Sequence, residues 1–427
     1  MELGPELENE WIPRVHTVGI KGGLPLENVF CGAINGKMSP LSSIPSLRVE
    51  CAKNLITCRD EQVAMRKLDV QSIEDISLGA PILGTGGGGD PYIGKLMAVD
   101  AVSENGPVTL LEPSEVPDDA LILPTALMGA PTVAVEKIPR GDEVIETLRA
   151  LEKRFGAKAY ATMSVEAGGL NSTIPLGVAA RLRIPVVDGD GMGRAFPEIQ
   201  MFTFHLHGVS ATPMAMADEK GNAIMLETVT DQWTERIARS IAVAMGGVAM
   251  VSLYPSFGKQ LKESIVPNTI SLAERIGKFL RESRQMKKQD PVDGLLKLVD
   301  GYRLFKGKVV DVMRRTVGGF AKGEATIEGI DEYRGSVLKM HFQNENLVAF
   351  RDDKVLASVP DLITTLEMET GLPITTEGLR YGYRVTVIGI PCNEQWRTKE
   401  GLKLVGPRYF GYDVDYVPIE ERMAGNK

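Results

Sequence analysis

Three glycine-bearing polar segments contain the side chains of this sequence that are best suited to chemistry. The longest, residues 187–200, reads VDGDGMGRAFPEIQ and begins in an apolar stretch that we predict to be a strand. Its charged residues are Asp188, Asp190, Arg194 and Glu198. Carboxylates can act as general bases or bind a hard metal ion, and arginine can hold a carboxylate or a carbonyl oxygen. The segment therefore predicts a polar-substrate site in which Asp188 and Glu198 bind the substrate. An Asx-type turn with a surface ion pair is the alternative.

The second segment, residues 164–173, reads SVEAGGLNST and combines an acid with glycines and an amide. It also follows a predicted strand, and open α/β sheets bind ligands at the carboxyl ends of their strands. We expect Glu166, as a candidate general base, and Asn171, as a substrate-binding residue, to converge with Asp190 if the strands are neighbours. A plain polar loop is the alternative interpretation.

The third segment is a cluster of seven glycines between Gly79 and Gly94. Glycine loses much conformational entropy on ordering, so such a run indicates positive φ angles or close approach of the backbone to a ligand. A helix is expected to begin after it, at Pro91, where exposed amides favour an anionic or strongly polar group. The residues that we expect to bind substrate here are Gly86, Gly87, Gly88, Gly89 and Asp90. A hinge or a tight packing loop is the alternative.

Two nucleotide-binding patterns nearly fit the glycine cluster. The GxGxxG spacing of residues 84–89 follows a predicted helix, whereas a dinucleotide site requires a strand at that position. The Walker spacing of residues 89–95 is followed by Leu96, where a serine or threonine is needed to bind Mg²⁺. A nucleotide is therefore not the favoured ligand.

Two of the four histidines, His205 and His207, stand two residues apart in the sequence FHLHG. We predict a strand over residues 199–207, which would point both imidazoles to one face. With Asp188 or Asp190 as a third ligand, they would form an open His/His/carboxylate site for a divalent metal ion. A pair of solvated or hydrogen-bonded histidines is the alternative.

The helices and strands predicted around these residues indicate an α/β fold followed by a smaller β-rich domain. Apolar strands alternate with helices over residues 67–235, which is typical of a mostly parallel or mixed sheet covered by helices. The clearest helix covers residues 142–155. Residues 236–300 continue with a strand and helices that bridge to the next domain, and alternating strands dominate residues 301–427. Residues 1–66 show no sustained period, and we interpret them as an extension of doubtful order.

The composition of the chain excludes some classes of function. The 427 residues include 43% hydrophobic and 24% charged residues, as in globular proteins. The net charge of −8 gives no general attraction to nucleic acid. No apolar run approaches the roughly 20 residues of a membrane span, and the acidic N-terminus lacks the basic region of a secretory signal. We therefore expect a cytoplasmic protein that binds neither nucleic acid nor membrane.

Four long motifs of the chain occur together in one known family. They read ILGTGGGGDP, DGDGMGRAFPEIQM, TPMAMAD and, near the C-terminus, GPRYFGYDVDYVPIE. Over residues 68–420 the sequence thus resembles the S-methyl-thiohydantoin desulfurase family, formerly a domain-of-unknown-function family. The resemblance implies work on five-membered cyclic ureides or their thio analogues, and association with hydantoinase/oxoprolinase-type proteins.

We therefore expect a hydrolase that attacks ring C2 of a thiohydantoin or hydantoin-like compound and releases sulfide or a thiol. Asp190 or Glu166 would be the general base, and the amides of residues 86–89 would stabilise charge on a ring heteroatom. Arg194 would hold a carboxylate or a ring carbonyl of the substrate. The rival hypothesis is a noncatalytic accessory subunit of a hydantoinase/oxoprolinase system that binds a small anion. The ring substituents, the metal and the formation of a homo-oligomer stay open.

Overall fold

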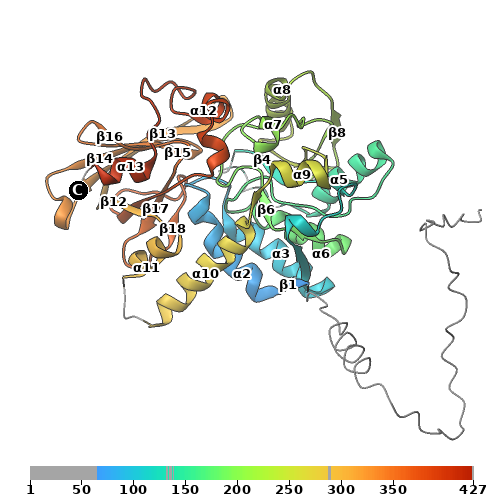
Figure 1. The fold of residues 1–427 in the computed structure, drawn as a ribbon, viewed down its shortest axis with the longest axis horizontal. Helices are drawn as coiled ribbons and strands as arrows, with labels where there is room; N and C mark the ends of the chain where they lie inside the picture. Colours follow the sequence, from blue (N-terminus) through green and yellow to red (C-terminus); the bar gives the residue numbers. More distant parts are fainter. Residues whose placement is uncertain (1–64, 131–132, 134–136, 138, 287–289, 426–427) are drawn as a thin grey trace, which may run out of the picture. The chain divides into compact units, whose positions relative to one another are not determined.

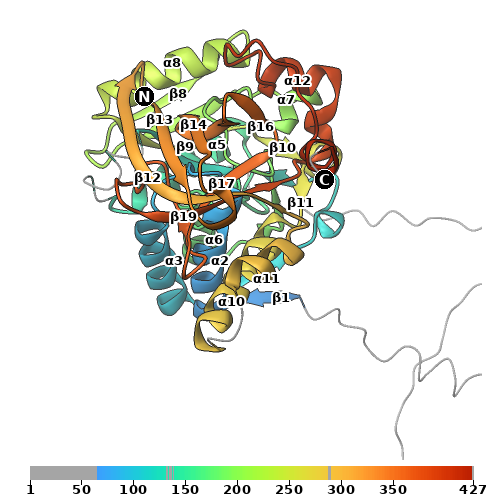
Figure 2. The same cartoon turned by 90° about the vertical axis from the view of Figure 1, so that its left-hand side faces the viewer.

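The structure, a computed structural model, describes residues 65–425 except 131–132, 134–136, 138 and 287–289. The predicted extension over residues 1–66 therefore lies almost wholly outside the described residues. All described residues fall within one compact unit, shown from two sides in Figures 1 and 2. None of the described helices combines the length and the apolar character needed to cross a lipid bilayer.

A mixed sheet lies at the centre of the first half of the described chain. Strands β2 (Val108–Leu111) and β5 (Val186–Val187) run parallel, and β1 (Arg66–Leu68) pairs antiparallel with β2. Residues 161–164 form parallel bridges to β5 on one side, and to β3 (Leu121–Ile122) and β4 (Thr125–Gly129) on the other. These parallel strands all end at one edge of the sheet, which is where open α/β sheets bind ligands.

Beyond β4 the sheet continues with antiparallel strands. They are β9 (Val248–Ser252), β7 (Met214–Ala217) and β8 (Ala223–Leu226), in that order. Every residue of β7 and β9 is buried, and burial on both faces explains why these strands are nearly continuous apolar runs. The sheet is thus mixed, with antiparallel strands on both sides of the parallel ones.

Helices pack around this sheet and connect it to the second half. They are α2 (Val70–Leu83), α3 (Pro91–Asn105), α5 (Asp142–Phe155), α6 (Ile174–Leu182), α7 (Thr203–Leu206), α8 (Asp231–Ala244), α9 (Gly258–Ser264), α10 (Thr269–Met286) and α11 (Pro291–Leu298). Helices α2 and α10 lie side by side (Figures 1 and 2). A Cβ on Gly79 would lie 1.9 Å from the Ala273 carbonyl oxygen, so glycine permits this close approach. Arg281 then donates two hydrogen bonds, of 2.7 and 2.8 Å, to the Asp75 carboxylate.

The second half is dominated by an eight-stranded antiparallel sheet, drawn in orange tones in Figure 1. In spatial order its strands are β16 (Lys354–Ser358), β15 (Glu345–Arg351), β14 (Val337–Gln343), β13 (Phe320–Gly329), β12 (Tyr302–Val317), β19 (Arg384–Ile390), β17 (Leu362–Glu367) and β18 (Pro373–Ile374). A second apolar core includes the buried side chains of Phe305, Ile327 and Val387. Helices α12 (Lys399–Val405) and α13 (Ile419–Ala424) follow. The β-rich C-terminal architecture expected from the alternating sequence is confirmed.

Candidate active site

The three polar segments of the sequence meet at the carboxyl edge of the parallel strands. The Gly88 carbonyl accepts a hydrogen bond from the Leu170 amide (2.8 Å), which joins the glycine cluster to the second segment. The Gly191 amide donates to the Val165 carbonyl (3.1 Å), which joins the second segment to the third. All three line a cleft of about 100 Å³. This volume is comparable to the roughly 150 Å³ cavity that holds one benzene molecule, so the cleft has the scale of a single small molecule.

Charged and amide side chains from both halves line this cleft. They are Glu166, Asn171, Glu198, Glu235, Arg239, Asn344 and Glu345. Glu345 begins β15 of the eight-stranded sheet and Asn344 directly precedes it, whereas the others come from the first half of the chain and from α8. The cleft is therefore completed only when the two halves pack together.

Backbone geometry explains why glycine clusters beside the cleft. Gly86, Gly88 and Gly89 have φ angles of 91°, 78° and 79°, in the left-handed region that favours glycine. A Cβ on Gly88 would lie 2.6 Å from the Cα of Gly168. Gly88 and Gly89 line the cleft, and neither amide has a hydrogen-bond partner among the described residues. These two amides can therefore donate to a ligand.

Glu166 is only 7% exposed and contributes its carboxyl group to the cleft. The Asn171 side chain donates to Glu166 Oε1 (2.6 Å) and is itself held by the Leu127 amide (2.8 Å). Burial raises the pKa of Glu166 to about 7 against the hydrogen bond from Asn171, and the charge of Asp190 adds to the increase. A carboxyl group with such a pKa can exchange protons at neutral pH. The structure thus brings Glu166, Asn171 and Asp190 together.

Asp190 is fully buried next to this group and lies outside the cleft lining. It belongs to β6 (Gly189–Asp190), which pairs with β11 (Val266–Pro267). Its Oδ1 accepts hydrogen bonds from the Met192 and Gly193 amides (2.5 Å each), while Oδ2 has no partner in the described structure. Burial raises the pKa of Asp190 to about 7 against these two amides. The charge of Asp190 therefore disfavours ionisation of Glu166.

Arg194 is also fully buried, and all the N–H groups of its guanidinium donate within the protein. The acceptors are the Ala195, Pro360, Asp361 and Asn346 carbonyls and the Thr85 hydroxyl, at 2.7 to 3.2 Å. Arg194 therefore has no N–H group left to form the expected hydrogen bond with a substrate carboxylate or carbonyl. Arg194 instead connects the glycine cluster to the second half of the chain, and we assign it a positioning role.

Sequence reasoning missed Glu345, the first residue of β15. Glu345 is 3% exposed and lines the cleft. A Cβ on Gly87 would lie 2.0 Å from Glu345 Oε1, so Gly87 leaves room for this carboxyl group. Burial raises the pKa of Glu345 well above its usual value, and the charge of Glu166 adds to this effect. The only signal in the sequence is the polar run of residues 343–346 before an apolar stretch, which is typical of an ordinary turn.

Two acids that we expected to bind substrate serve as helix caps. The Asp90 carboxylate accepts from the Tyr92 amide (2.8 Å) at the start of α3. The Asp188 carboxylate accepts from the amide (3.0 Å) and the hydroxyl group of Ser271 in the first turn of α10. The structure places both carboxylates outside the cleft lining, because each is committed to a helix end.

The expected binding residue Glu198 lines the cleft and has partners of its own. Its carboxylate accepts from the Tyr409 hydroxyl (2.7 Å) and from the Gln200 side chain. Tyr409 belongs to the C-terminal motif, which therefore contacts a residue of the cleft wall. Helix α8 supports the same wall, since Glu235 accepts from the Ile199 amide (3.0 Å) and pairs with Arg239.

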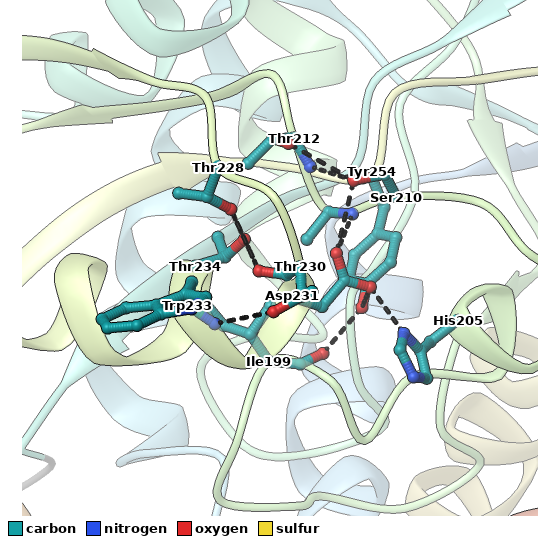
Figure 3. Close-up of polar contacts among 11 residues, drawn as sticks. Ile199, His205, Ser210, Thr212, Thr228, Thr230, Asp231, Trp233, Thr234 and Tyr254 are labelled. Atoms are coloured by element: carbon teal, nitrogen blue, oxygen red, sulfur yellow. Dashed lines mark hydrogen bonds and ion pairs between the residues drawn. The ribbon is translucent and has the colours of Figure 1, made fainter.

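The predicted strand over residues 199–207 is wrong, because residues 203–206 form helix α7. Residues two apart on a helix do not face each other, and the two imidazoles have different partners. His205 Nδ1 lies 2.7 Å from Asp231 Oδ2, and Figure 3 shows this contact beside Tyr254. His207 Nε2 lies 2.9 Å from Gln395 Oε1. Among the described residues no three His, Cys, Asp or Glu side chains gather as metal ligands, so the expected His205/His207/aspartate site is not formed.

Family models match nearly the whole of the described chain. The S-Me-THD-like N-terminal domain matches residues 71–228, and the S-Me-THD-like C-terminal domain matches residues 229–419. The chain belongs to the S-Me-THD-like family. The resemblance of its motifs to the S-methyl-thiohydantoin desulfurases is thereby confirmed. No match was found among curated proteins.

The S-Me-THD-like fold also occurs in a solved structure. The crystal structure of a protein from Chromobacterium violaceum superposes with a TM-score of 0.68. It is 22% identical, and the match covers 83% of this chain and all of that one. At this identity the likeness supports the fold alone.

The boundary between the two S-Me-THD-like domains falls inside a sheet. Strands β4, β7 and β8 lie in the N-terminal match, whereas β9 lies in the C-terminal match and pairs with both β4 and β7. The two matched parts are therefore interleaved in space.

Proposed function

We propose that this S-Me-THD-like protein hydrolyses a thiohydantoin-type ring at C2 and releases a thiol or sulfide. Glu166 carries the proposal, because it is a buried carboxyl group in a small cleft and its pKa is raised to about 7. Such a group can take a proton from water at neutral pH. Family membership favours the thiohydantoin substrate class.

The reaction begins with attack of water on C2 of an S-alkyl thiohydantoin. One water proton passes to Glu166, the water oxygen bonds to C2, and the electron pair of the C2–N double bond moves to the ring nitrogen. The amides of Gly88 and Gly89 stabilise the charge there, and one such donor contributes roughly 3 kcal/mol. The C2–S bond then breaks with its electron pair on sulfur, while the second water proton moves to the ring nitrogen. Water and substrate thus become a hydantoin and, after one proton reaches sulfur, a thiol.

Two buried residues outside the cleft lining support this chemistry. The charge of Asp190 helps to keep the pKa of Glu166 high, so Glu166 is a better base than an exposed glutamate. Arg194 fixes the backbone of Asn346 relative to Thr85, which places the glycine cluster against the second half. We assign neither of them direct contact with the substrate.

Thiol release from S-methyl-thiohydantoin under anaerobic conditions tests the proposal. Glu166→Gln keeps the shape of the side chain but removes the base, so kcat should fall a hundredfold or more. Glu146→Gln, on an exposed position of α5, is the control and should retain the wild-type rate. An unchanged rate in Glu166→Gln would exclude Glu166 as the base. Failure of the wild type to turn over any thiohydantoin or hydantoin would overturn the hydrolase proposal.

The accessory-subunit hypothesis predicts binding of a small anion without turnover, and co-purification with a hydantoinase-type enzyme. The cleft does not favour an anion, because its lining includes the acids Glu198 and Glu235. Its cation, Arg239, is paired with Glu235. The same thiol assay therefore separates the two hypotheses.

A further inference from the structure

Glu345 lies where the two halves of the chain meet at the cleft. The Asn346 amide donates to the Thr85 carbonyl (2.8 Å), which fixes the start of β15 against the glycine cluster. The Asn346 side chain donates to the Ile363 carbonyl (2.9 Å). The carboxyl group of Glu345 is thus carried by a rigid strand end and packs against Gly87.

Glu345 differs from other acids of the cleft in its hydrogen-bond partners. Glu198 is held by Tyr409, and Glu235 is paired with Arg239. Glu345 Oε2 is buried and has no hydrogen-bond partner among the described residues. A buried charged oxygen without a partner is costly, whereas a neutral carboxylic acid is tolerated and has one O–H to donate. Burial and the nearby Glu166 raise the pKa of Glu345 well above its usual value, which favours the protonated form.

We propose that Glu345 is the general acid that protonates the departing sulfur. This inference rests on the hydrolysis proposed above. The Glu345 O–H proton moves to sulfur as the C2–S bond breaks and its electron pair goes to sulfur. Glu345 is left as a carboxylate and recovers a proton from Glu166, which took it from the attacking water. Two neighbouring carboxyl groups with different environments thereby act as base and acid in one cycle.

The dependence of the rate on the leaving group tests this role. An alkanethiolate leaves slowly without a proton, whereas a 4-nitrophenyl thiolate is stable enough to leave as an anion. Glu345→Gln should therefore lower kcat about a hundredfold for an S-methyl thiohydantoin, and only a few-fold for the S-(4-nitrophenyl) analogue. Glu166→Gln should be slow with both substrates, because water must be activated in each case.

The outcomes distinguish this inference from the reaction on which it depends. If the wild type releases no thiol from either substrate, the proposed function fails. If the wild type is active and Glu345→Gln loses the same factor with both substrates, Glu345 has only a structural role. If Glu345→Gln retains the wild-type rate with both, it has no role in the reaction. Glu328→Gln, at an exposed position of β13, is the matched control and should behave as wild type.

A second variant displaces the acid without changing its chemistry. Gly87 has no positive φ, so alanine is compatible with its backbone, but the new Cβ would lie 2.0 Å from Glu345 Oε1. Gly87→Ala should reproduce the leaving-group dependence of Glu345→Gln, and the double variant should be no slower than the slower single variant. Additive losses would contradict the assignment. Thermal unfolding of each variant shows whether the fold is retained.

Discussion

Glu166 illustrates how the surroundings of one residue set its chemical role. The pKa of a glutamate in water is about 4.5, too low for an effective base at neutral pH. In the cleft, loss of water around the carboxyl group outweighs the hydrogen bond from Asn171 and raises the pKa to about 7. The same effect disfavours the folded state once the carboxyl group must ionise, so activity and stability oppose each other at this position.

The stability of Glu166→Gln should therefore depend on pH differently from that of the wild type. Below pH 4.5 the glutamate is protonated in both the folded and the unfolded state, so ionisation adds no penalty. Between pH 4.5 and 7 the unfolded state loses its proton first, and the wild type loses up to about 3 kcal/mol of unfolding free energy. The variant lacks this loss. Its free energy of unfolding relative to wild type, measured in urea at pH 4.5 and 8, should be higher at pH 8, and equal differences would contradict a raised pKa.

At the scale of elements, sequence periodicity and helix-end signals predicted the bounds of some helices and the wrong secondary structure for other segments. The helix expected over residues 142–155 has those bounds in α5, because Gly141 and Gly156 adopt the left-handed conformation at its two ends. The segment 199–207 is apolar and aromatic like a strand, yet Phe202 and Phe204 pack with Tyr254 around helix α7. Local pattern could not show this, because Tyr254 comes from a distant part of the chain.

Two helical glycines should respond in opposite ways to alanine. Alanine favours helix over glycine by about 1 kcal/mol, so Gly177→Ala should stabilise the protein by up to that amount, since its new Cβ would lie 3.6 Å from the Cα of Ala98. Gly79→Ala should instead destabilise it by about 1–3 kcal/mol, because the Cβ would meet the Ala273 carbonyl of α10. Urea unfolding measures both. Stabilisation by Gly79→Ala would mean that α2 and α10 separate easily.

At the scale of the whole molecule, Arg194 links parts of the fold that are far apart in sequence. A lysine offers three donors, fewer than the five hydrogen bonds that Arg194 forms. Arg194→Lys should lower the free energy of unfolding by about 3 kcal/mol or more, because hydrogen bonds from a buried charge are lost. Arg149→Lys, at an exposed position of α5, should have little effect and serves as the control in urea unfolding. A stable Arg194→Lys variant would show that this link is dispensable.

The same long-range packing limits what the sequence could reveal of the candidate site. Glycine spacing and strand ends predicted that the segments around Gly88, Glu166 and Asp190 would converge, since each follows an element readable from local pattern. Glu345 could not be found in this way, because its place depends on how the eight-stranded sheet packs against the glycine cluster. The donors of Arg194 could not be predicted either, since most of its acceptors are carbonyls of the second half.

The position of β9 between β4 and β7 has a consequence for the evolution of the gene. A gene truncated at residue 228 would encode β4 and β7 without the strand that separates them. Their unpaired backbone groups would then attract strands of other molecules and promote aggregation. Recombination between the genes of distant relatives at this point would also bring in a β9 strand that must pair with β4 and β7 of another protein. Gene fission and exchange of single halves should therefore be rare in the lineage of this protein.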